Sequence, residues 1–321
     1  MEEVVSQKIL VTGGFGCIGA NLSSYLSRKG EKIRIASRNR DFPDIAELSK
    51  CEFFSYDFND FNSLLANTSD IDCVIHLASL NSRACFENPT EAERVNGEYT
   101  SRILNASIAN NVRYFIYFST AHVYKSPLTG EFDEFSPTES KHPYGTSHLI
   151  GEEILLSQIK KKKIQGAVFR VSNSVGLPLN KSANCWDLIF NDFCRNAIRD
   201  GSITIKNNAF LRRDFISLDL LNKITYNFIS KQIKSNSPIY NISSGNSISL
   251  LEASELVSER YKKLFNKELK VLVKDKSKLN NRLHIKNSKV ANKLNFELNN
   301  NLERSIDEIL IYFDKKLNTN D

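Results

Sequence analysis

The segment Thr12-Gly-Gly-Phe-Gly-Cys-Ile-Gly19 holds four of the 13 glycines in the chain, so the backbone here needs residues without a Cβ atom. It follows a short apolar run, Lys8–Thr12, and leads into a stretch in which Ile18, Leu22 and Leu26 fall on one helical face. A strand, a glycine-rich turn and a helix in this order are the context that a GxGxxG match requires. Such a turn lets a dinucleotide pyrophosphate approach the backbone at a helix N-terminus. We therefore predict a dinucleotide-binding turn; a glycine-rich turn that only packs is the alternative.

The residues expected to line the cofactor at this turn are Gly13, Phe15, Gly16, Cys17, Ile18 and Gly19. Beyond it, short apolar runs alternate with amphipathic stretches through the first half of the chain. Strands are expected at 32–36, 52–56, 73–77, 114–118 and 167–171, and helices near 89–109 and 144–159. This alternation predicts an α/β fold with a doubly wound parallel sheet of the Rossmann type.

The alternation ends after Asn173, and the second half is less regular. Helices are expected at 186–199, 218–229, 250–264 and 302–315, strands at 202–205 and 239–242, an irregular segment at 212–216 and an Asn-rich turn at 292–301. We predict a dinucleotide-binding domain over 1–172, to which 217–240 returns. Residues 173–216 and 241–321 would form a second, smaller α/β lobe that binds the substrate.

The composition is that of a globular protein. Of 321 residues, 41% are hydrophobic and 25% are charged, which excludes a mainly disordered or fibrous chain. The net charge of +6 is spread along the sequence, so no nucleic-acid partner is expected. The run Lys160–Lys163 is interpreted as the cationic end of a helix, with an anionic partner surface as the alternative.

Targeting and metal-binding signals are absent from the sequence. Met1–Gln7 carries two glutamates and no basic residue before Lys8, and no apolar run approaches the roughly 18 residues that cross a bilayer. We expect a soluble, cytoplasmic protein with no membrane partner. The six cysteines have no CxxC or paired Cys/His spacing, which predicts reduced thiols and no metal site.

The end of the second predicted strand bears on the choice of dinucleotide. It has the sequence Ala36-Ser-Arg-Asn-Arg40, without the carboxylate that would hold the hydroxyls of an adenine ribose. Arg38 or Arg40 could pair with a 2′-phosphate, so NADP is slightly favoured over NAD; a solvated charged loop is the alternative. Asp57 is expected near the adenine or, alternatively, as a helix cap before Asn62. The residues expected at this end are Ser37, Arg38, Asp57 and Phe58.

Two further segments combine hydroxyl, phenol and imidazole groups. The strand expected at 114–118 runs into Ser119-Thr-Ala-His-Val-Tyr124, and His142-Pro-Tyr-Gly-Thr-Ser-His148 opens a helix. Here the chain resembles the extended short-chain dehydrogenase/reductase family of sugar-nucleotide epimerases, dehydratases and 4-keto reductases. The matching motifs span most of the chain: TGGFGCIG at 12–19, HLAS at 76–79, VNGEYT at 95–100, FSTAHVYK at 118–125, HPYGTSHLIGEE at 142–153, FRVSNSVGLP at 169–178, RRDFISLD at 212–219 and YNISSG at 240–245.

The resemblance implies roles for individual residues. Tyr144 would exchange a proton with a sugar hydroxyl or carbonyl while hydride moves to or from nicotinamide, and Thr120 would hydrogen-bond the same oxygen. Ser119 would lie beside the nicotinamide. Leu77, Ala78, Ser79 and Asn96 would line or support the cofactor cleft, and Asn173, Arg213 and Arg282 would contact the nucleotide sugar. Asn96 as a structural cap and Arg282 as a surface residue are the alternatives, and His122 and His142 are interpreted as incidental.

One departure from the family pattern concerns the cofactor and the tyrosine. The family has Tyr-x-x-x-Lys, in which the lysine binds the nicotinamide ribose and lowers the pKa of the tyrosine. This sequence has His148 in that place. An unperturbed imidazole is mostly neutral near pH 7, so His148 can donate a hydrogen bond but supplies a weaker, pH-dependent field. Three interpretations stay open: an active enzyme whose tyrosine has a higher pKa, slow chemistry on a tightly held cofactor, or binding without chemistry.

A second departure bears on the reaction. Family dehydratases carry an acidic pair after the Ser/Thr, and here Ala121 and His122 stand in those places, which disfavours a dehydratase. We therefore expect an NAD(P)-dependent oxidoreductase or epimerase that acts at C4 or a neighbouring carbon of a nucleotide-activated sugar, for polysaccharide or glycoconjugate synthesis. The alternative is a non-catalytic NAD(P)-binding sensor or scaffold. The predicted helices at 89–109 and 144–159 resemble the dimer interface of the family, so a homodimer is expected.

Overall fold

Seven parallel strands form the central sheet, in the order β11-β7-β5-β4-β1-β2-β3. The computed structural model describes residues 6–275 and 282–318. The strands are β1 (Lys8–Thr12), β2 (Lys32–Ser37), β3 (Glu52–Ser55), β4 (Cys73–His76), β5 (Tyr114–Thr120), β7 (Gln165–Val171) and β11 (Ile239–Ile242). The strand order reverses between β1 and β4, and ligands of such sheets bind at this switch point, beyond the carboxyl ends of the strands.

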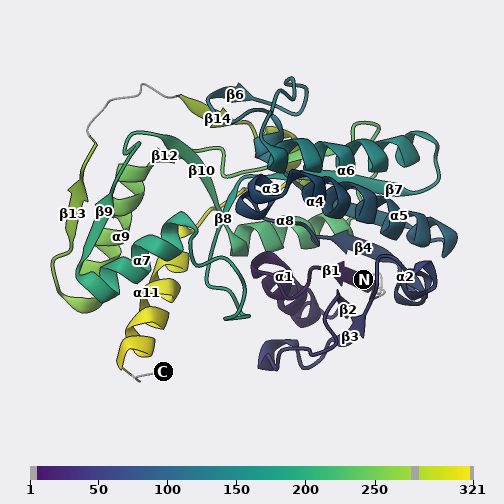
Figure 1. Ribbon diagram of the computed structural model, residues 1–321, viewed down its shortest axis with the longest axis horizontal. Coiled ribbons are helices and arrows are strands. Elements are labelled where there is room, and N and C mark those ends of the chain that lie inside the picture. Colours follow the sequence, from purple (N-terminus) through teal and green to yellow (C-terminus); the bar gives the residue numbers. More distant parts are fainter. Residues whose placement is uncertain (1–5, 276–281, 319–321) are drawn as a thin grey trace.

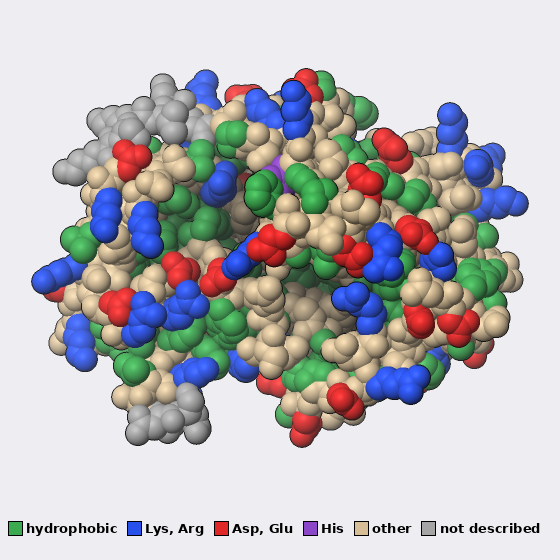
Figure 2. All heavy atoms as spheres, viewed as in Figure 1, with side chains coloured by type: hydrophobic (Ala, Val, Ile, Leu, Met, Phe, Trp, Pro, Cys, Tyr) green, Lys and Arg blue, Asp and Glu red, His purple; other side chains and the backbone are tan. Residues whose placement is uncertain are grey.

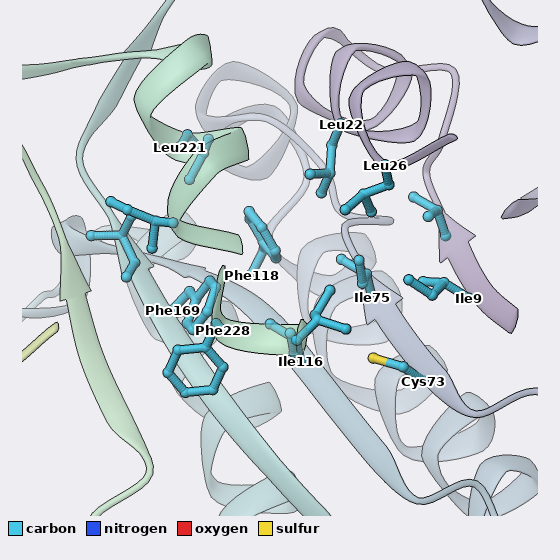
Figure 3. Close-up of a cluster of buried hydrophobic side chains, with 14 of the residues drawn as sticks. Ile9, Leu22, Leu26, Cys73, Ile75, Ile116, Phe118, Phe169, Leu221 and Phe228 are labelled. Atoms are coloured by element: carbon cyan, nitrogen blue, oxygen red, sulfur yellow. The ribbon is translucent and has the colours of Figure 1, made fainter. Parts of the chain in front are cut away.

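Helices cover both faces of this sheet (Figure 1). One face packs against α1 (Cys17–Arg28) and α8 (Leu218–Ser230), and the other against α2 (Phe61–Thr68), α5 (Tyr99–Ala109) and α6 (Pro143–Lys160). Figure 3 shows side chains of the first two helices meeting those of the sheet, among them Leu22, Leu26, Phe118, Phe169, Leu221 and Phe228. Each such apolar side chain contributes about 1.5–3 kcal/mol on burial. The predicted doubly wound α/β fold is confirmed.

The segment predicted as one helix near 89–109 consists of three pieces. After α3 (Ser82–Glu87) come α4 (Pro89–Glu93), a π-helical turn η2 (Arg94–Glu98) and α5. The turn packs against α6 so closely that a Cβ atom at Gly97 would lie 2.8 Å from Cγ2 of Ile150. The periodicity of apolar residues cannot predict a π-helical turn of this kind. Such turns are often found at functional sites.

The second half builds three smaller sheets beside the main one. These pair β12 (Ser247–Ser249), β10 (Arg212–Ser217) and β8 (Asn173–Val175); β13 (Lys270–Val273) and β9 (Ser202–Ile205); and β14 (Leu283–Ile285) and β6 (Gly130–Phe132). The remaining helices are α7 (Ile189–Asp200), α9 (Leu250–Phe265), α10 (Ser288–Leu294) and α11 (Leu302–Asn318), with short turns η1 (Ala46–Leu48) and η3 (Ala121–Val123). A separate apolar core joins α7, α9 and α11 at one end of the molecule (Figure 1). The predicted domain boundaries stay a prediction.

Three local expectations for this half were wrong. The segment 212–216, expected to be irregular, is strand β10, because β8 and β12 from distant parts of the chain supply its hydrogen-bonding partners. The helix expected from Trp186 begins at Ile189. The Asn-rich segment starts inside α10, which ends at Leu294 and is followed by Asn295 with φ of +50°.

Charged side chains of both signs are interspersed on the face shown in Figure 2. Among the residues that the structure describes, no helix has the length and apolarity needed to span a membrane.

Candidate active site

The glycine turn packs tightly against the end of β4. Gly13 has φ of +68°, and a Cβ atom there would lie 2.8 Å from the backbone nitrogen of Ala78. A Cβ atom at Gly19 would overlap the carbonyl oxygen of Gly13, which already accepts a hydrogen bond from the Gly16 nitrogen at 3.0 Å. Helix α1 begins directly afterwards, at Cys17. The turn therefore leaves its backbone bare at a helix N-terminus, an arrangement that suits a pyrophosphate.

A cavity of about 340 Å³ lies beside this turn, where the ends of β5 and β7 face α7 and β8. It brings together predicted site residues from five separate stretches of sequence, namely Ile18, Leu77, Ser79, Ser119, Thr120, Tyr144, His148 and Asn173. It is also lined by residues of the second half that the sequence did not single out, among them Asp187, Leu188, Phe190, Asn191 and Phe215. The cavity thus contains the predicted proton-transfer group together with one end of the predicted cofactor turn.

Tyr144 is held at the start of α6. Pro143 occupies the first turn of the helix, and Nδ1 of His142 accepts a hydrogen bond from the Tyr144 backbone nitrogen at 3.2 Å. Burial raises the pKa of the Tyr144 phenol, and a hydrogen bond with the Thr120 side chain opposes this rise. The Thr120 hydroxyl oxygen also accepts from the His122 backbone nitrogen at 3.2 Å, which fixes it at the end of β5. The predicted Thr120–Tyr144 pair is therefore assembled.

His148 lies one helical turn beyond Tyr144, and the centroids of the two rings are 4.7 Å apart. The residue is 2% exposed, and burial lowers the pKa of its imidazole to about 3. Its Nδ1 atom is buried without a hydrogen-bonding partner. The imidazole is thus neutral throughout the physiological range, so the weaker field expected from it does not vary with pH there. The orphaned nitrogen thus belongs to a residue that lines the cavity.

A buried ion pair behind Ser119 was not predicted from the sequence. Glu152, which is 1% exposed, accepts hydrogen bonds from the Ser119 hydroxyl at 2.5 Å and from Nη2 of Arg170 at 2.7 Å. The spacing of four from Tyr144 to His148 and again to Glu152 places all three on one helix face. That repeat was the available signal, but a glutamate in a helix is normally solvated.

His122, which was expected to be incidental, lines the cavity. Its ring centroid is 6.1 Å from that of Tyr144. Burial, with a contribution from the nearby Arg213 charge, lowers the pKa of His122 to about 4, so its imidazole is also neutral near pH 7. It adds a hydrogen-bonding group that a sugar hydroxyl could meet.

Asn96 connects the segment after β4 with helix α6 through its side-chain amide. It is completely buried; its Oδ1 accepts from the Leu80 backbone nitrogen at 2.9 Å, and its Nδ2 donates to the Ser147 hydroxyl at 2.9 Å. It therefore ties the chain after β4, which includes Leu77 and Ala78, to helix α6.

The predicted adenosine end forms a second hollow, which Arg38, Arg40, Tyr56, Asp57 and Phe58 help to line. The Phe58 ring stacks on that of Tyr99 with centroids 4.3 Å apart. Oδ1 of Asp57 accepts from the Asn59 backbone nitrogen at 2.8 Å, whereas the cap of α2 is Asp60, so the helix-cap alternative for Asp57 was wrong. The Ser37 hydroxyl accepts from the Asn39 backbone nitrogen at 3.2 Å.

The three predicted substrate contacts differ in their positions. Asn173 lines the cavity, and its Nδ2 donates to the Asp214 carbonyl oxygen at 2.9 Å. Arg213 is not among the residues that line this cavity; its Nη1 is buried without a hydrogen-bonding partner, and burial lowers the pKa of its guanidinium. Arg282 is exposed beside β14 and is not among the residues lining the cavity, so its role stays a prediction.

A family model described as the NAD dependent epimerase/dehydratase family matches residues 9–243. The chain is 29% identical over 182 residues to dTDP-D-glucose 4,6-dehydratase of Homo sapiens, which covers 53% of this chain and 52% of that protein. It is 27% identical over 266 residues to ADP-L-glycero-D-manno-heptose-6-epimerase of Brachyspira hyodysenteriae, covering 79% and 81% of the two chains. The fold matches UDP-glucose 4-epimerase of Thermotoga maritima with a TM-score of 0.82 at 20% identity, over 97% and 99% of the chains.

These similarities bear on two expectations. The chain spans about half the length of the human dehydratase that it matches. The expectation that a dehydratase is disfavoured is not supported by the comparisons, because a dehydratase is among the relatives.

Proposed function

Because this chain belongs to the NAD dependent epimerase/dehydratase family, we propose that it moves a hydride between a nicotinamide dinucleotide and C4, or a neighbouring carbon, of a nucleotide-activated sugar. The observation that carries the proposal is the cavity in which the Tyr144 phenol and the Thr120 hydroxyl adjoin the glycine turn. Oxidation of a sugar alcohol needs a proton acceptor at the oxygen while hydride leaves the carbon, and the reverse step needs a proton donor. The products would serve polysaccharide or glycoconjugate synthesis.

The chain's residues fit a dinucleotide, since Gly13 and Gly19, whose close backbone contacts leave no room for a Cβ atom, keep the turn free of side chains there at the N-terminus of α1. When bound, the dinucleotide supplies the hydride acceptor or donor. The turn would hold its pyrophosphate, and Phe58 and Asp57 would border its adenosine. We propose NADP rather than NAD, because Arg38 adjoins that hollow and the end of β2 has no carboxylate.

In the proposed mechanism, Tyr144 carries the proton. Its phenol, whose pKa is raised by burial, is a proton donor in the reductive direction and needs deprotonation to act in the oxidative one. Thr120 would hold the reacting oxygen beside it, and the orphaned Nδ1 of His148 would hydrogen-bond the ribose of the dinucleotide. Asn173 and Arg213 would orient the nucleotide sugar, with the unpaired guanidinium facing phosphate.

We propose 4-epimerisation or 4-keto reduction ahead of dehydration. Eliminating water requires an acid and a base next to the sugar in addition to Tyr144. Ala121, in the place of the first acidic residue, is 1% exposed and has no proton to give. The neutral His122 alone cannot serve as both groups.

The test combines calorimetry with product analysis on the purified chain. We expect binding of NAD(H) or NADP(H), tighter for the phosphorylated form, and conversion of at least one UDP-, dTDP- or ADP-sugar detected by NMR. An epimer formed without added reductant indicates an epimerase, and consumption of NADPH a reductase. Binding without turnover of any sugar would favour the sensor or scaffold, and no dinucleotide binding would refute the proposal.

Replacing His148 with Lys should move the acid limb of the pH–rate profile to lower pH. The ammonium would lie close to the Tyr144 phenol, whose ring is now 4.7 Å from the imidazole, and a nearby opposite charge favours the phenolate. Tyrosinate is the base form, so the oxidative rate rises with pH through the tyrosine pKa. A fall of roughly one to three units in that pKa shifts the limb by the same amount.

The control for this experiment is His148→Gln, which keeps a neutral hydrogen-bonding group at the same place. Its profile should keep the wild-type acid limb. An unmoved limb in a folded His148→Lys variant, checked by thermal melting, would show that residue 148 does not set the tyrosine pKa.

We also propose a homodimer that forms through α5 and α6. Helix α6 keeps Ile150, Ile154 and Leu156 only half-buried within one copy, and these would be covered by a partner. Sedimentation velocity at micromolar concentration measures the mass. We propose a cytoplasmic location for this enzyme as well.

A further inference from the structure

Residues 177–188, which make up all but the first residue of the connection from β8 to α7, form a loop that is fastened to the glycine turn. Nδ2 of Asn180 donates to the carbonyl oxygen of Phe15 at 2.8 Å, and Nδ2 of Asn21 donates to the carbonyl oxygens of Leu177 at 3.2 Å and Cys17 at 2.9 Å. In Figure 1 this loop descends beside α1. The loop therefore bridges the predicted cofactor turn and the second half of the molecule.

The other side of the same loop contacts the C-terminal helix α11. The Trp186 ring stacks on that of Tyr312 with centroids 5.2 Å apart, and its Nε1 donates to the Lys181 carbonyl oxygen at 3.0 Å. Asp187 and Leu188, which end the loop, line the cavity that contains Tyr144. A change in how the loop is held thus reaches the wall of the candidate active site.

A pair of thiols joins the loop to the turn. Cys185, at 5% exposure, and Cys17, the partly exposed first residue of α1, share a hydrogen bond between their side chains. That bond, with a contribution from the Lys181 charge, lowers the pKa of Cys185, while it raises the pKa of Cys17. Cys185 is therefore the better thiolate, and Cys17 is the thiol in contact with it.

The four other cysteines have a different setting. They are all buried, and burial raises the pKa of each thiol, namely Cys51 (to about 11), Cys73, Cys85 and Cys194. A buried thiol with a raised pKa is a poor nucleophile. The pair at the loop thus differs from the rest of the chain's cysteines in contact, charge and position.

We propose that Cys185 and Cys17 form a modification site at which a hydroperoxide converts two thiols into a disulfide, pinning the 177–188 loop to the glycine turn. The Cys185 thiolate attacks the peroxide, so an S–O bond forms, the O–O bond breaks and an alcohol or water leaves. The Cys17 sulfur then attacks the resulting sulfenic acid. An S–S bond forms, the S–O bond breaks and water departs with the remaining proton. Both thiols are oxidised and the hydroperoxide is reduced.

The consequence for ligand exchange rests on the proposed function. A dinucleotide or sugar that leaves between the turn and the loop needs the loop to move away from the turn. The disulfide restricts this movement. Oxidation should therefore slow release of a bound dinucleotide. Conversely, a dinucleotide on the turn should cover Cys17 and slow its oxidation.

The test treats the full chain with a stoichiometric amount of hydrogen peroxide. The free thiols should fall from six to four, and peptide mass spectrometry should find Cys17 linked to Cys185, reversibly with dithiothreitol. Trp186 is the chain's only tryptophan and adjoins Cys185, so disulfide formation should quench its fluorescence. Cys17→Ser and Cys185→Ser should each abolish the link and the quench, whereas Cys51→Ser should retain both.

Other outcomes overturn the proposal. Equal oxidation of all six cysteines, or oxidation of Cys185 to a sulfinic acid while Cys17 stays free, would show that the two thiols do not act as a pair. The thiol count and mass spectrum need no dinucleotide, so they stand even if calorimetry finds no cofactor binding and the proposed function fails. A disulfide that leaves the dinucleotide dissociation rate unchanged would refute the pinning of the loop.

Discussion

Replacing Tyr144 with Phe should lower turnover by about 10²- to 10⁴-fold, the range that a positioned acid–base group contributes. The substitution removes one oxygen from a ring that α6 and Pro143 hold in place, so the fold should be unaffected. Dinucleotide affinity should stay close to that of the wild type, because the glycine turn, and not the phenol, is expected to hold the pyrophosphate. Steady-state kinetics and calorimetry on the same preparation separate the two effects.

The matched control is Tyr25→Phe. Tyr25 lies on α1, where its ring meets that of Tyr226 with centroids 6.2 Å apart, and it does not line the cavity. Its turnover should equal that of the wild type. Full activity in Tyr144→Phe would remove Tyr144 as the proton-transfer group and leave the neutral His122 as the nearest alternative.

Replacing Glu152 with Gln should cost about 3–5 kcal/mol of unfolding free energy, because it leaves a buried guanidinium without its counter-charge. Arg170 is 4% exposed, and its Nε and Nη2 both donate to the Glu152 carboxylate. Its Nη1 has no hydrogen-bonding partner, and its guanidinium carbon lies 4.9 Å from the centroid of the Tyr124 ring. The contact with the Tyr124 ring does not replace the lost negative charge of Glu152. Urea titration of the purified variant measures the change.

Glu153 supplies the control for this prediction. It is the next residue on α6 and is exposed, so Glu153→Gln should change stability by no more than about 0.5 kcal/mol. The double variant Glu152→Gln with Arg170→Met removes both charges and should recover most of the loss. If Glu152→Gln is as stable as Glu153→Gln, the pair is not the buried ionic contact described above.

The regular elements of the first half could be predicted because their signals are local. Strand β1 contains the apolar run Ile9–Val11, and α1 places Leu22 and Leu26 on the face that meets the sheet. Where the signal was not local, prediction failed. Strand β10 carries Arg212, Arg213 and Asp214 at its start, and only its partners β8 and β12 make it a strand.

The candidate site divides in the same way. Motif order pointed to Thr120, Tyr144 and His148, and the structure brings these three into one cavity. The repeat of four along α6 placed Glu152 on the same helix face as Tyr144, but no sequence spacing predicts its contact with Ser119 or the contact between the Cys17 and Cys185 thiols.

The sequence by itself determined the alternation of strands and helices, the bare backbone of the glycine turn and the identity of the groups at 120, 144 and 148. These follow from periodicity and residue type, which each stretch of chain carries without its neighbours. Tertiary structure alone decided which groups lose their water. Burial lowers the pKa of His148, so that its imidazole is neutral near pH 7, and raises the pKa of Tyr144, while the fold brings Glu152 together with Arg170. The free energy of desolvating a charge depends on everything packed around it, and that surrounding comes from residues far apart in the chain.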